Sequence, residues 1–247
     1  MQRFFVSESS FEGECVRLSP AQAHQVCHVL RLTPGDGIVV LDDSGFEYDA
    51  VLLTVTGREA TCRIGEKRPA GGEPQVQVTL FQSLLARDKF EWVLQKGTEV
   101  GVTRFVPVLT RRSIVRGKRI EEKKFTRWRR ILTEAAEQSH RGRVPQLDPE
   151  IDFVEAAARL GSFDCSVLAA PCDQGVSLKD ALESRVEKPS SVALVIGPEG
   201  GLTDAEIALA CESGAVKISL GPRILRTETA AVVASALTLY ELGQMMP

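Results

Sequence analysis

Two short apolar runs near the C-terminus, each followed by a glycine-containing loop, constrain the fold of this chain most. The first run covers 192–196 (VALVI) and is followed by GPEGG at 197–201, the first loop; the second covers 216–220 (VKISL) and is followed by GPRILR at 221–226, the second loop. Uninterrupted runs of this length are typical of strands buried on both faces of a parallel sheet. Because ligands bind beyond the carboxyl ends of such strands, the two loops predict one small-molecule site.

Strand and helix signals alternate from residue 76 onward. Three further apolar runs, at 76–81, 105–109 and 166–170, complete a predicted set of about five strands. The amphipathic segments between them, including a long one at 121–139, fit the crossover helices of a parallel sheet. The chain is therefore predicted to be an α/β protein.

Capping residues mark several of these helices. The predicted starts are Asp88 with Glu91, Thr203 with Glu206, and Thr227 or Thr229. Gly101 and Gly214 stand where a left-handed residue ends two of the helices.

The N-terminal quarter has a different pattern, in which short strands are separated by turn signals. The expected strands are 3–6, 15–18, 38–41, 46–55 and 60–64. One helix interrupts them at 20–30, with Ser19 as its cap, and a small β-barrel is the natural closure. Residues 67–74 (KRPAGGEP) predict a linker. The expected domains are therefore 1–70 and 75–247.

The composition is that of an ordinary soluble protein, with 43% hydrophobic and 26% charged residues. No apolar run approaches the ~20 residues of a membrane span, and the N-terminus lacks a signal-peptide pattern, so we expect a cytoplasmic protein without a membrane partner. Six scattered cysteines and three histidines give no metal-ligand spacing. We expect reduced thiols, with a Cys165–Cys172 redox pair as the alternative.

Positive charge is concentrated in one segment of a chain whose net charge is −3. Residues 111–130 hold ten Lys or Arg against two Glu. Such a segment is able to neutralise several phosphates of a nucleic acid; the alternative is a solvated helix face. Trp128 falls on the apolar stripe of the helix, which favours core packing over base stacking.

The glycines of the first loop, Gly197, Gly200 and Gly201, permit positive φ and close approach of the backbone to a ligand. The alternative is a tight turn into a capped helix. Neither loop matches a P-loop or a dinucleotide-binding fingerprint, so nucleoside triphosphates and nicotinamide dinucleotides are disfavoured as ligands.

Few side chains offer acid–base chemistry. His24, His28 and His140 form no pattern with a nucleophile and are interpreted as structural. Acidic candidates are Glu199 and Glu228 beside the loops and, more distantly, Glu134; each has an alternative role at a helix end or on a helix face.

Four motifs resemble the SPOUT superfamily of methyltransferases, and within it the bacterial ribosomal RNA small subunit methyltransferase E family. They are QKGTEVG at 95–101, EAAEQS at 134–139 with Arg141, IGPEGG at 196–201, and LGPRILRTETA at 220–230. The resemblance runs nearly end to end, because RFFV at 3–6 and the strands that follow it also resemble the N-terminal domain of that family.

The resemblance implies a PUA-like RNA-binding barrel followed by a trefoil-knotted SPOUT domain that binds S-adenosylmethionine. It further implies a homodimer that methylates N3 of a uridine in the decoding region of 16S rRNA on the assembled small ribosomal subunit, without a metal. A non-catalytic RNA-binding assembly factor with the same fold is the alternative, and a dinucleotide-dependent oxidoreductase is a more distant one.

The resemblance also implies site residues. The expected cofactor-binding residues are Ala169, Ala170, Ile196, Gly197, Glu199, Gly200, Gly201, Ser219, Leu220, Gly221, Ile224, Leu225 and Arg226. The expected catalytic residues are Arg226, which would stabilise a uracil anion, and Glu199 or Glu228, either of which would accept the N3 proton. The expected RNA-binding residues are Arg3, Arg111, Arg112, Arg116, Lys118, Arg119 and Arg141.

Overall fold

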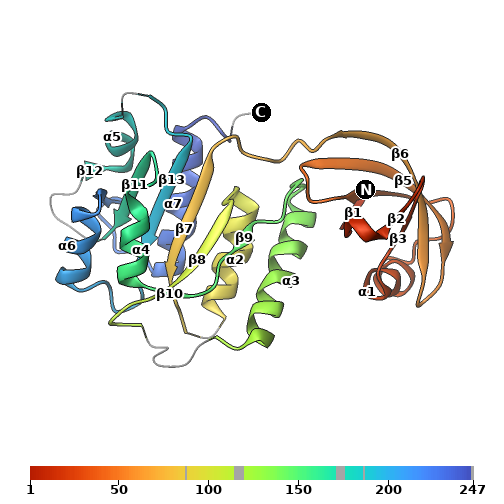
Figure 1. Ribbon diagram of the computed structural model, residues 1–247, viewed down its shortest axis with the longest axis horizontal. Coiled ribbons are helices and arrows are strands. Elements are labelled where there is room, and N and C mark those ends of the chain that lie inside the picture. The colour runs from red at the N-terminus through yellow and green to blue at the C-terminus, as the bar shows by residue number, and fades with distance from the viewer. Residues whose placement is uncertain (87, 114–119, 171–175, 186, 246–247) are drawn as a thin grey trace. The chain divides into compact units, whose positions relative to one another are not determined.

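The computed structural model describes residues 1–86, 88–113, 120–170, 176–185 and 187–245. The chain forms two compact units (Figure 1). The first comprises Met1–Glu73 and Ala136–Val144, and the second comprises Pro74–Ala135 and Pro145–Pro247.

A six-stranded sheet forms the body of the first unit. Its elements are β1 (Gln2–Phe5), a 3₁₀ turn (Glu8–Ser10), β2 (Phe11–Glu12), β3 (Cys15–Arg17), α1 (Pro20–His24), a π-helical turn (Gln25–Val29), β4 (Gly37–Leu41), β5 (Phe46–Val55) and β6 (Ala60–Pro69). The strand order is β1-β4-β5-β6-β3-β2, and every pair is antiparallel except β1 with β4. One core, which includes Phe4, Val26 and Leu52, lies against this sheet and α1.

Two local predictions for this unit have clear outcomes. Ser19 caps α1 with a complete capping box, as its sequence predicts. The predicted start of the linker at Lys67 is wrong, because β6 continues to Pro69. Residues 67–69 pair with the start of β5, which supplies the backbone hydrogen bonds that a free linker would lack.

The second unit contains a parallel sheet with helices on its faces. Its elements are β7 (Gln77–Ser83), α2 (Lys89–Val100), β8 (Arg104–Leu109), α3 (Glu122–Gln138, whose last turn belongs to the first unit), β9 (Gln146–Leu147), β10 (Ile151–Asp152), α4 (Phe153–Leu160), β11 (Cys165–Ala169), β12 (Val176–Ser177), α5 (Leu178–Glu183), β13 (Ser191–Ile196), α6 (Asp204–Glu212), β14 (Ala215–Ser219) and α7 (Thr227–Glu241). The order is β10-β8-β7-β13-β11-β14-β12, with β9 also paired to β8, and every pair is parallel.

The α/β class and the parallel sheet are confirmed, whereas the expected strand number is too low. Within the described ranges the sheet has eight strands, and the three that were not predicted, β9, β10 and β12, have two residues each. A two-residue strand carries no hydrophobic period, because it is defined by its partner and not by its own sequence.

Helices cover the sheet on both sides (Figure 1). On one face, α4 and α6 pack with residues such as Phe81, Val106 and Val195 in a single apolar core. The helices α2 and α7 pack against each other, and α7 also contacts β7 and β13. Strand β13 is buried almost throughout, but β14 leaves Val216 and Lys217 half-buried, because its outer neighbour is the short β12.

The predicted caps of α2 and α7 differ from the structure, whereas the predicted cap of α6 is confirmed. Thr203 and Glu206 form the predicted capping box. Asp88 precedes α2 without a side-chain cap bond. The cap position of α7 is Arg226, so neither predicted threonine caps this helix, and Thr227 is instead its first residue. Gly101 and Gly214 both adopt the expected positive φ, of 111° and 96°.

The described cysteines form no disulfide bond. Five cysteines are described, all of them free, and burial raises the pKa of the Cys165 thiol; Cys172 lies outside the described residues. Within the described ranges, no helix has the length and apolar character needed to cross a membrane.

Candidate functional site

The carboxyl ends of three adjacent strands form one edge of the second unit. Ala169, at the end of β11, pairs with Ile196 of β13 on one side and with Ile218 of β14 on the other. The first loop leaves this edge from β13, and the second loop leaves it from β14. Residues that lie 27 and 49 positions apart in the sequence are therefore neighbours at the place where parallel sheets bind ligands.

The first loop is a tight turn with one left-handed residue. The amide of Gly201 donates to the carbonyl of Pro198 at 2.9 Å, and Gly201 has φ +68°. Positive φ at Gly197 and Gly200 is not found, so that expectation is wrong for both. A Cβ at Gly197 would lie 3.1 Å from Cγ of Leu202, so a larger residue there would require the Leu202 side chain to shift.

Arginine side chains and backbone from the end of β8 hold the first loop from one side. Nη1 of Arg112 donates to the carbonyl oxygens of Gly200 at 3.1 Å and Leu202 at 3.4 Å. The amide of Arg111 donates to Glu206 at 2.8 Å. The guanidinium of Arg112 is thus used to fix the loop that it contacts.

Glu206 anchors the start of α6 directly after this loop. Its carboxylate accepts from the amide and hydroxyl of Thr203, each at 2.8 Å, and from the Arg111 amide. Burial by itself would raise the pKa of Glu206, but these hydrogen bonds outweigh it and hold the pKa below its ordinary value.

Thr227 and Gln82 hold the first loop from the side of α7. The Thr227 hydroxyl donates to the carbonyl of Gly197, and the Gln82 amide donates to the Thr227 oxygen at 3.4 Å. Gln82 is fully buried, and its Oε1 has no hydrogen-bond partner among the described residues.

Lys89 connects two predicted catalytic candidates. Its Nζ lies 3.3 Å from Oε1 of Glu199 on the first loop and 3.7 Å from Oε1 of Glu228 on α7. Oε2 of Glu228 is shielded from solvent and has no partner in the described part of the chain. The structure therefore brings Glu199 and Glu228 together through a lysine at the start of α2.

The second loop makes few contacts within the chain. Ser219 and Gly221 exchange two hydrogen bonds of 3.3 Å, and Gly221 has φ +104° with open space on its Cβ side. Ile224 is 88% exposed, and Leu225 is half-buried. The exposed Arg226 side chain has no ion pair or hydrogen bond recorded with any described residue.

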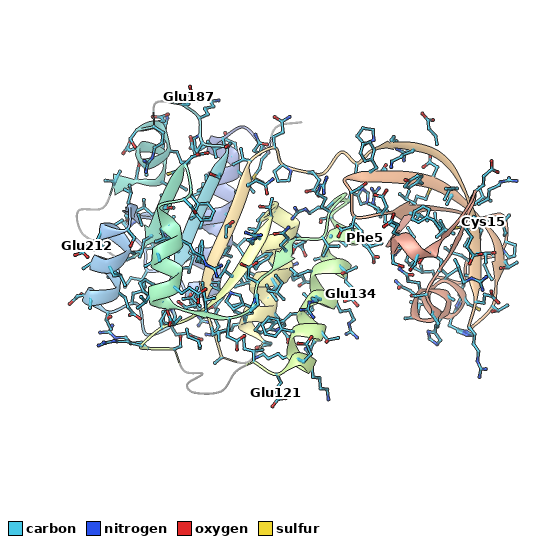
Figure 2. All side chains as sticks on the ribbon, viewed as in Figure 1. Phe5, Cys15, Glu121, Glu134, Glu187 and Glu212 are labelled. Carbon is cyan, nitrogen blue, oxygen red and sulfur yellow. The ribbon has the colours of Figure 1, made fainter. Side chains whose placement is uncertain are left out.

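The other candidate acid–base residues are placed elsewhere. Glu134 lies on α3 (Figure 2), where it pairs with Arg130 at 3.3 Å on the exposed helix face. His24 and His28 stack on each other at 4.7 Å in the first unit. The described residues contain no group of three or more His, Cys, Asp or Glu that could hold a metal ion.

The predicted RNA-binding arginines differ in exposure. Arg3 is 9% exposed and pairs with Glu47, and Arg141 is 2% exposed and pairs with Glu73 at 3.1 Å. Neither guanidinium is presented to solvent, so this geometry does not support them as RNA contacts. The predicted residues Arg116, Lys118 and Arg119 lie outside the described residues.

The basic helix face of α3 also forms ion pairs. Arg127 binds Glu91 at 2.6 Å and Arg129 binds Glu122 at 3.0 Å, with the arginines more than half exposed. Trp128 is fully buried, as its place on the apolar stripe predicts.

Three side chains of the site were not predicted from the sequence: Gln82, Lys89 and Thr227, the last of which was expected only as a helix cap. One signal could have found the first two, because each lies at or just after the carboxyl end of β7, on the same sheet edge as the loops. No signal in the sequence shows that the hydroxyl of Thr227 turns back to the first loop.

The class of protein follows from the matches of two family models, one to each part of the chain. A family model described as an RNA methyltransferase domain matches residues 72–239, and one described as an RNA methyltransferase PUA domain matches residues 18–65. The chain belongs to the ribosomal RNA small subunit methyltransferase E family.

Individual relatives agree with this assignment. The chain is 36% identical over 98% of its length to ribosomal RNA small subunit methyltransferase E of Bacillus subtilis, of which it covers 97%. A relative of the same name from Synechocystis is 35% identical over 95% of the chain and is covered to 76%. The crystal structure of ribosomal RNA small subunit methyltransferase E from Neisseria gonorrhoeae bound to S-adenosylmethionine superimposes with a TM-score of 0.87, at 32% identity and 97% coverage of both chains.

Proposed function

We propose that this protein transfers the methyl group of S-adenosylmethionine to N3 of a specific uridine in the decoding region of 16S rRNA. We further propose that it acts in the cytoplasm on the assembled small ribosomal subunit. The observation that carries the proposal is the edge where β13, β11 and β14 end beside two glycine loops, in a chain that matches a structure with bound S-adenosylmethionine over 97% of its length.

The described residues fit this cofactor. Gly201 and Gly221 both have positive φ at the sheet edge, and the Cβ side of Gly221 is open. The residues proposed to hold it are Ala169, Ala170, Ile196, Gly197, Glu199, Gly200, Gly201, Ser219, Leu220, Gly221, Ile224, Leu225 and Arg226. When bound, S-adenosylmethionine supplies an electrophilic methyl group whose transfer leaves a neutral thioether, so the chain's side chains have only to orient the base and remove a proton.

Three side chains are proposed to act on the uracil. N3 carries a proton that must leave before or during attack, and Glu199 and Glu228 are the carboxylates at the edge that could accept it. Arg226 has no recorded partner among the described residues, so its guanidinium is available to stabilise negative charge on O2 or O4.

We propose two domains, a PUA-like domain of residues 1–70 and a methyltransferase domain of residues 75–247. RNA binding is proposed for the PUA-like domain and for the basic segment of the methyltransferase domain that starts at Arg111. The segment includes Arg112, which also holds the first loop, and Arg116, Lys118 and Arg119. Arg3 and Arg141 are left out of this proposal because both are buried in ion pairs.

A homodimer is proposed because α2 and α7 expose large apolar side chains. Trp92 on α2 and Leu237 on α7 are each 42% exposed, and Tyr240 on α7 is 53% exposed. The two helices pack against each other, so these side chains lie on neighbouring elements. Large apolar side chains that stay exposed on packed neighbouring helices favour a protein interface.

One pair of experiments tests the proposed function. S-adenosylhomocysteine should raise the melting temperature, whereas nicotinamide dinucleotides should not. Mass mapping of 16S rRNA from a strain that lacks the protein should then show one uridine without its methyl group, and the intact gene should restore it. A complete set of methylated uridines in the deletion strain would contradict the proposed reaction and favour a non-catalytic assembly factor.

A further inference from the structure

A chain of buried hydrogen bonds joins β7, the start of α7 and the first loop. Gln82 lies near the carboxyl end of β7, in register with Ile196, which is the last residue before the first loop. Its Nε2 donates to the Ser83 carbonyl at 3.0 Å and to the Thr227 oxygen at 3.4 Å. The Thr227 hydroxyl in turn donates to the carbonyl of Gly197. The side chains of Gln82 and Thr227 are both buried, so water is poorly placed to replace a lost bond.

The acceptors of this chain fix its direction. The carbonyl oxygens of Ser83 and Gly197 can only accept hydrogen bonds. The amide of Gln82 must therefore turn its nitrogen toward Ser83, and the same nitrogen is the donor to Thr227. The Thr227 hydroxyl receives that bond and has its own hydrogen left for Gly197. A reversed Gln82 amide would place two acceptor oxygens against each other, so the bonds run from Gln82 through Thr227 to Gly197.

Thr227 connects the two glycine loops. It directly follows Arg226, the last residue of the second loop, and its hydroxyl binds Gly197, the first residue of the first loop. Among the described residues, this is the one hydrogen bond recorded between the first loop and α7. The end of one loop is therefore held against the beginning of the other by a single buried hydroxyl.

The other side chains that hold the first loop do little to connect it to the second. Arg112 reaches the first loop from beyond the end of β8, and Lys89 reaches Glu199 from α2. Lys89 also lies 3.7 Å from Glu228 on α7, but the lysine side chain is 35% exposed. An ion pair this open to solvent contributes little to holding two elements together. The spacing of the two loops therefore depends mainly on Thr227.

We propose that Thr227 is a positioning residue that holds the two loops together for S-adenosylmethionine, and that Gln82 acts through it by fixing the direction of its hydroxyl. This inference rests on the function proposed above, in which the cofactor contacts both loops. A ligand that spans two loops loses less free energy to ordering when the loops are already held. Loss of the hydroxyl should therefore weaken cofactor binding and leave the groups proposed to act on the uracil in place.

The first test compares Thr227→Val, which keeps the shape and loses the hydroxyl, with Thr227→Ser, which keeps the hydroxyl. The matched control is Thr238→Val on the same helix, because Thr238 is fully buried and its Oγ1 has no hydrogen-bond partner in the described part of the chain. Calorimetry measures S-adenosylhomocysteine affinity at a temperature where every variant is folded. We expect Thr227→Val to bind about five- to tenfold more weakly, the effect of one lost hydrogen bond. Thr227→Ser and Thr238→Val should stay within about 1.5-fold of wild type, because neither removes the bond to Gly197.

A double-mutant cycle tests whether Gln82 acts through Thr227. Gln82→Met removes the amide at a similar side-chain length and should weaken S-adenosylhomocysteine binding about threefold. In the Thr227→Val background the same change should have no further effect, because no hydroxyl is left to orient. Equal losses in both backgrounds would overturn the role given to Gln82. If Thr227→Val does not fold, Gln82→Met alone tests the inference, and unchanged affinity overturns it.

Steady-state kinetics separate positioning of the cofactor from the chemical step. Methyl transfer to small subunits from the deletion strain is measured with Thr227→Val. We expect KM for S-adenosylmethionine to rise by about the same five- to tenfold as the loss of affinity, with kcat changed less than about twofold. A fall in kcat with unchanged KM would contradict a role in holding the cofactor.

The outcomes also separate this inference from the proposed function. A lower melting temperature of Thr227→Val with unchanged S-adenosylhomocysteine affinity assigns Thr227 to stability alone and overturns the inference. An equal loss of affinity in Thr238→Val overturns it too. If the wild-type protein transfers no methyl group while Thr227→Val still loses affinity, the proposed function fails and the connection between the two loops stands.

Discussion

The two glycine loops leave the same edge of one sheet, yet the chain holds them very differently. The first loop is fixed by Arg112 from the end of β8, by Lys89 from α2 and by Thr227 from α7. Within the described part of the chain, the second loop has two hydrogen bonds between Ser219 and Gly221 and one from the Ala230 amide to the Arg226 carbonyl, and Ile224 is almost fully exposed.

The same sheet edge therefore carries one loop that is held by neighbouring elements and one loop whose groups are free to contact a ligand. A loop with side-chain bonds from three elements loses little further entropy when a ligand binds. A loop with few internal contacts has free backbone and apolar groups to offer to a ligand or a second subunit. We therefore expect substitutions around the first loop to lower stability and those in the second loop to lower binding.

The largest effect on stability should come from Glu206, which anchors the end of the first loop. Glu206→Gln should lower the free energy of unfolding by about 2–3 kcal/mol at pH 7, because a buried acceptor of three hydrogen bonds becomes partly a donor. Urea denaturation measures the change. Glu212→Gln, at the exposed end of the same helix, should stay within about 0.5 kcal/mol of wild type.

The same pair of variants predicts a pH dependence with a definite sign. The pKa of Glu206 is lowered in the folded protein, so its stabilisation is present above the ordinary glutamate pKa and is lost as pH falls through the folded value. The difference between wild type and Glu206→Gln should therefore shrink as the urea experiment moves from pH 7 into that acid range. A constant difference would contradict the role given to the ionised carboxylate.

The next effect compares two glycines that both have positive φ, Gly201 in the first loop and Gly221 in the second. Gly201→Ala should cost about 1–2 kcal/mol of stability, because alanine is strained at φ +68° and the loop around it is fixed. Gly221→Ala, at φ +104° in the second loop, should cost less, because that loop can relax. Gly200→Ala should be the mildest of the three, since this glycine has no positive φ. Equal losses of stability in Gly201→Ala and Gly221→Ala would contradict the inferred difference between the two loops.

A smaller effect is expected for the arginine that crosses to the first loop. Arg112→Ala should lower stability by about 1 kcal/mol, because the carbonyls of Gly200 and Leu202 lose a charged donor. Arg223→Ala removes an exposed arginine of the second loop and should stay within about 0.5 kcal/mol of wild type. Thermal unfolding of both variants measures the contrast, and similar losses would show that the second loop is anchored too.

The smallest effect on stability should follow substitution of Ile224. Ile224→Ser should leave the free energy of unfolding within about 0.5 kcal/mol of wild type, because the side chain is already exposed. It should weaken S-adenosylhomocysteine binding about fivefold in calorimetry, since a ligand would lose apolar contact there. Val154→Ser, on the exposed face of α4, is the control and should change neither quantity. Unchanged affinity in Ile224→Ser would indicate that another surface covers this residue.

Much of the fold is readable from the sequence, because its elements depend on local patterns. The buried run in β13 and the capping box of Thr203 and Glu206 were both predicted correctly. The short strands β9, β10 and β12 were not, since two residues carry no period. The burial of Arg3 and Arg141 was not predicted either, because it depends on Glu47 and Glu73, each more than 40 positions away.

The sequence by itself determined that two glycine loops follow two strands of a parallel sheet, and the chain's family gives that edge its proposed chemistry. Only the tertiary structure decided which loop is fixed, which glycine needs positive φ, and that Lys89 stands between Glu199 and Glu228. The physical reason is one of range. Periodicity and capping act over a few residues, whereas the ion pairs of Lys89 join residues more than 100 positions apart, which meet only when α2, the first loop and α7 pack together.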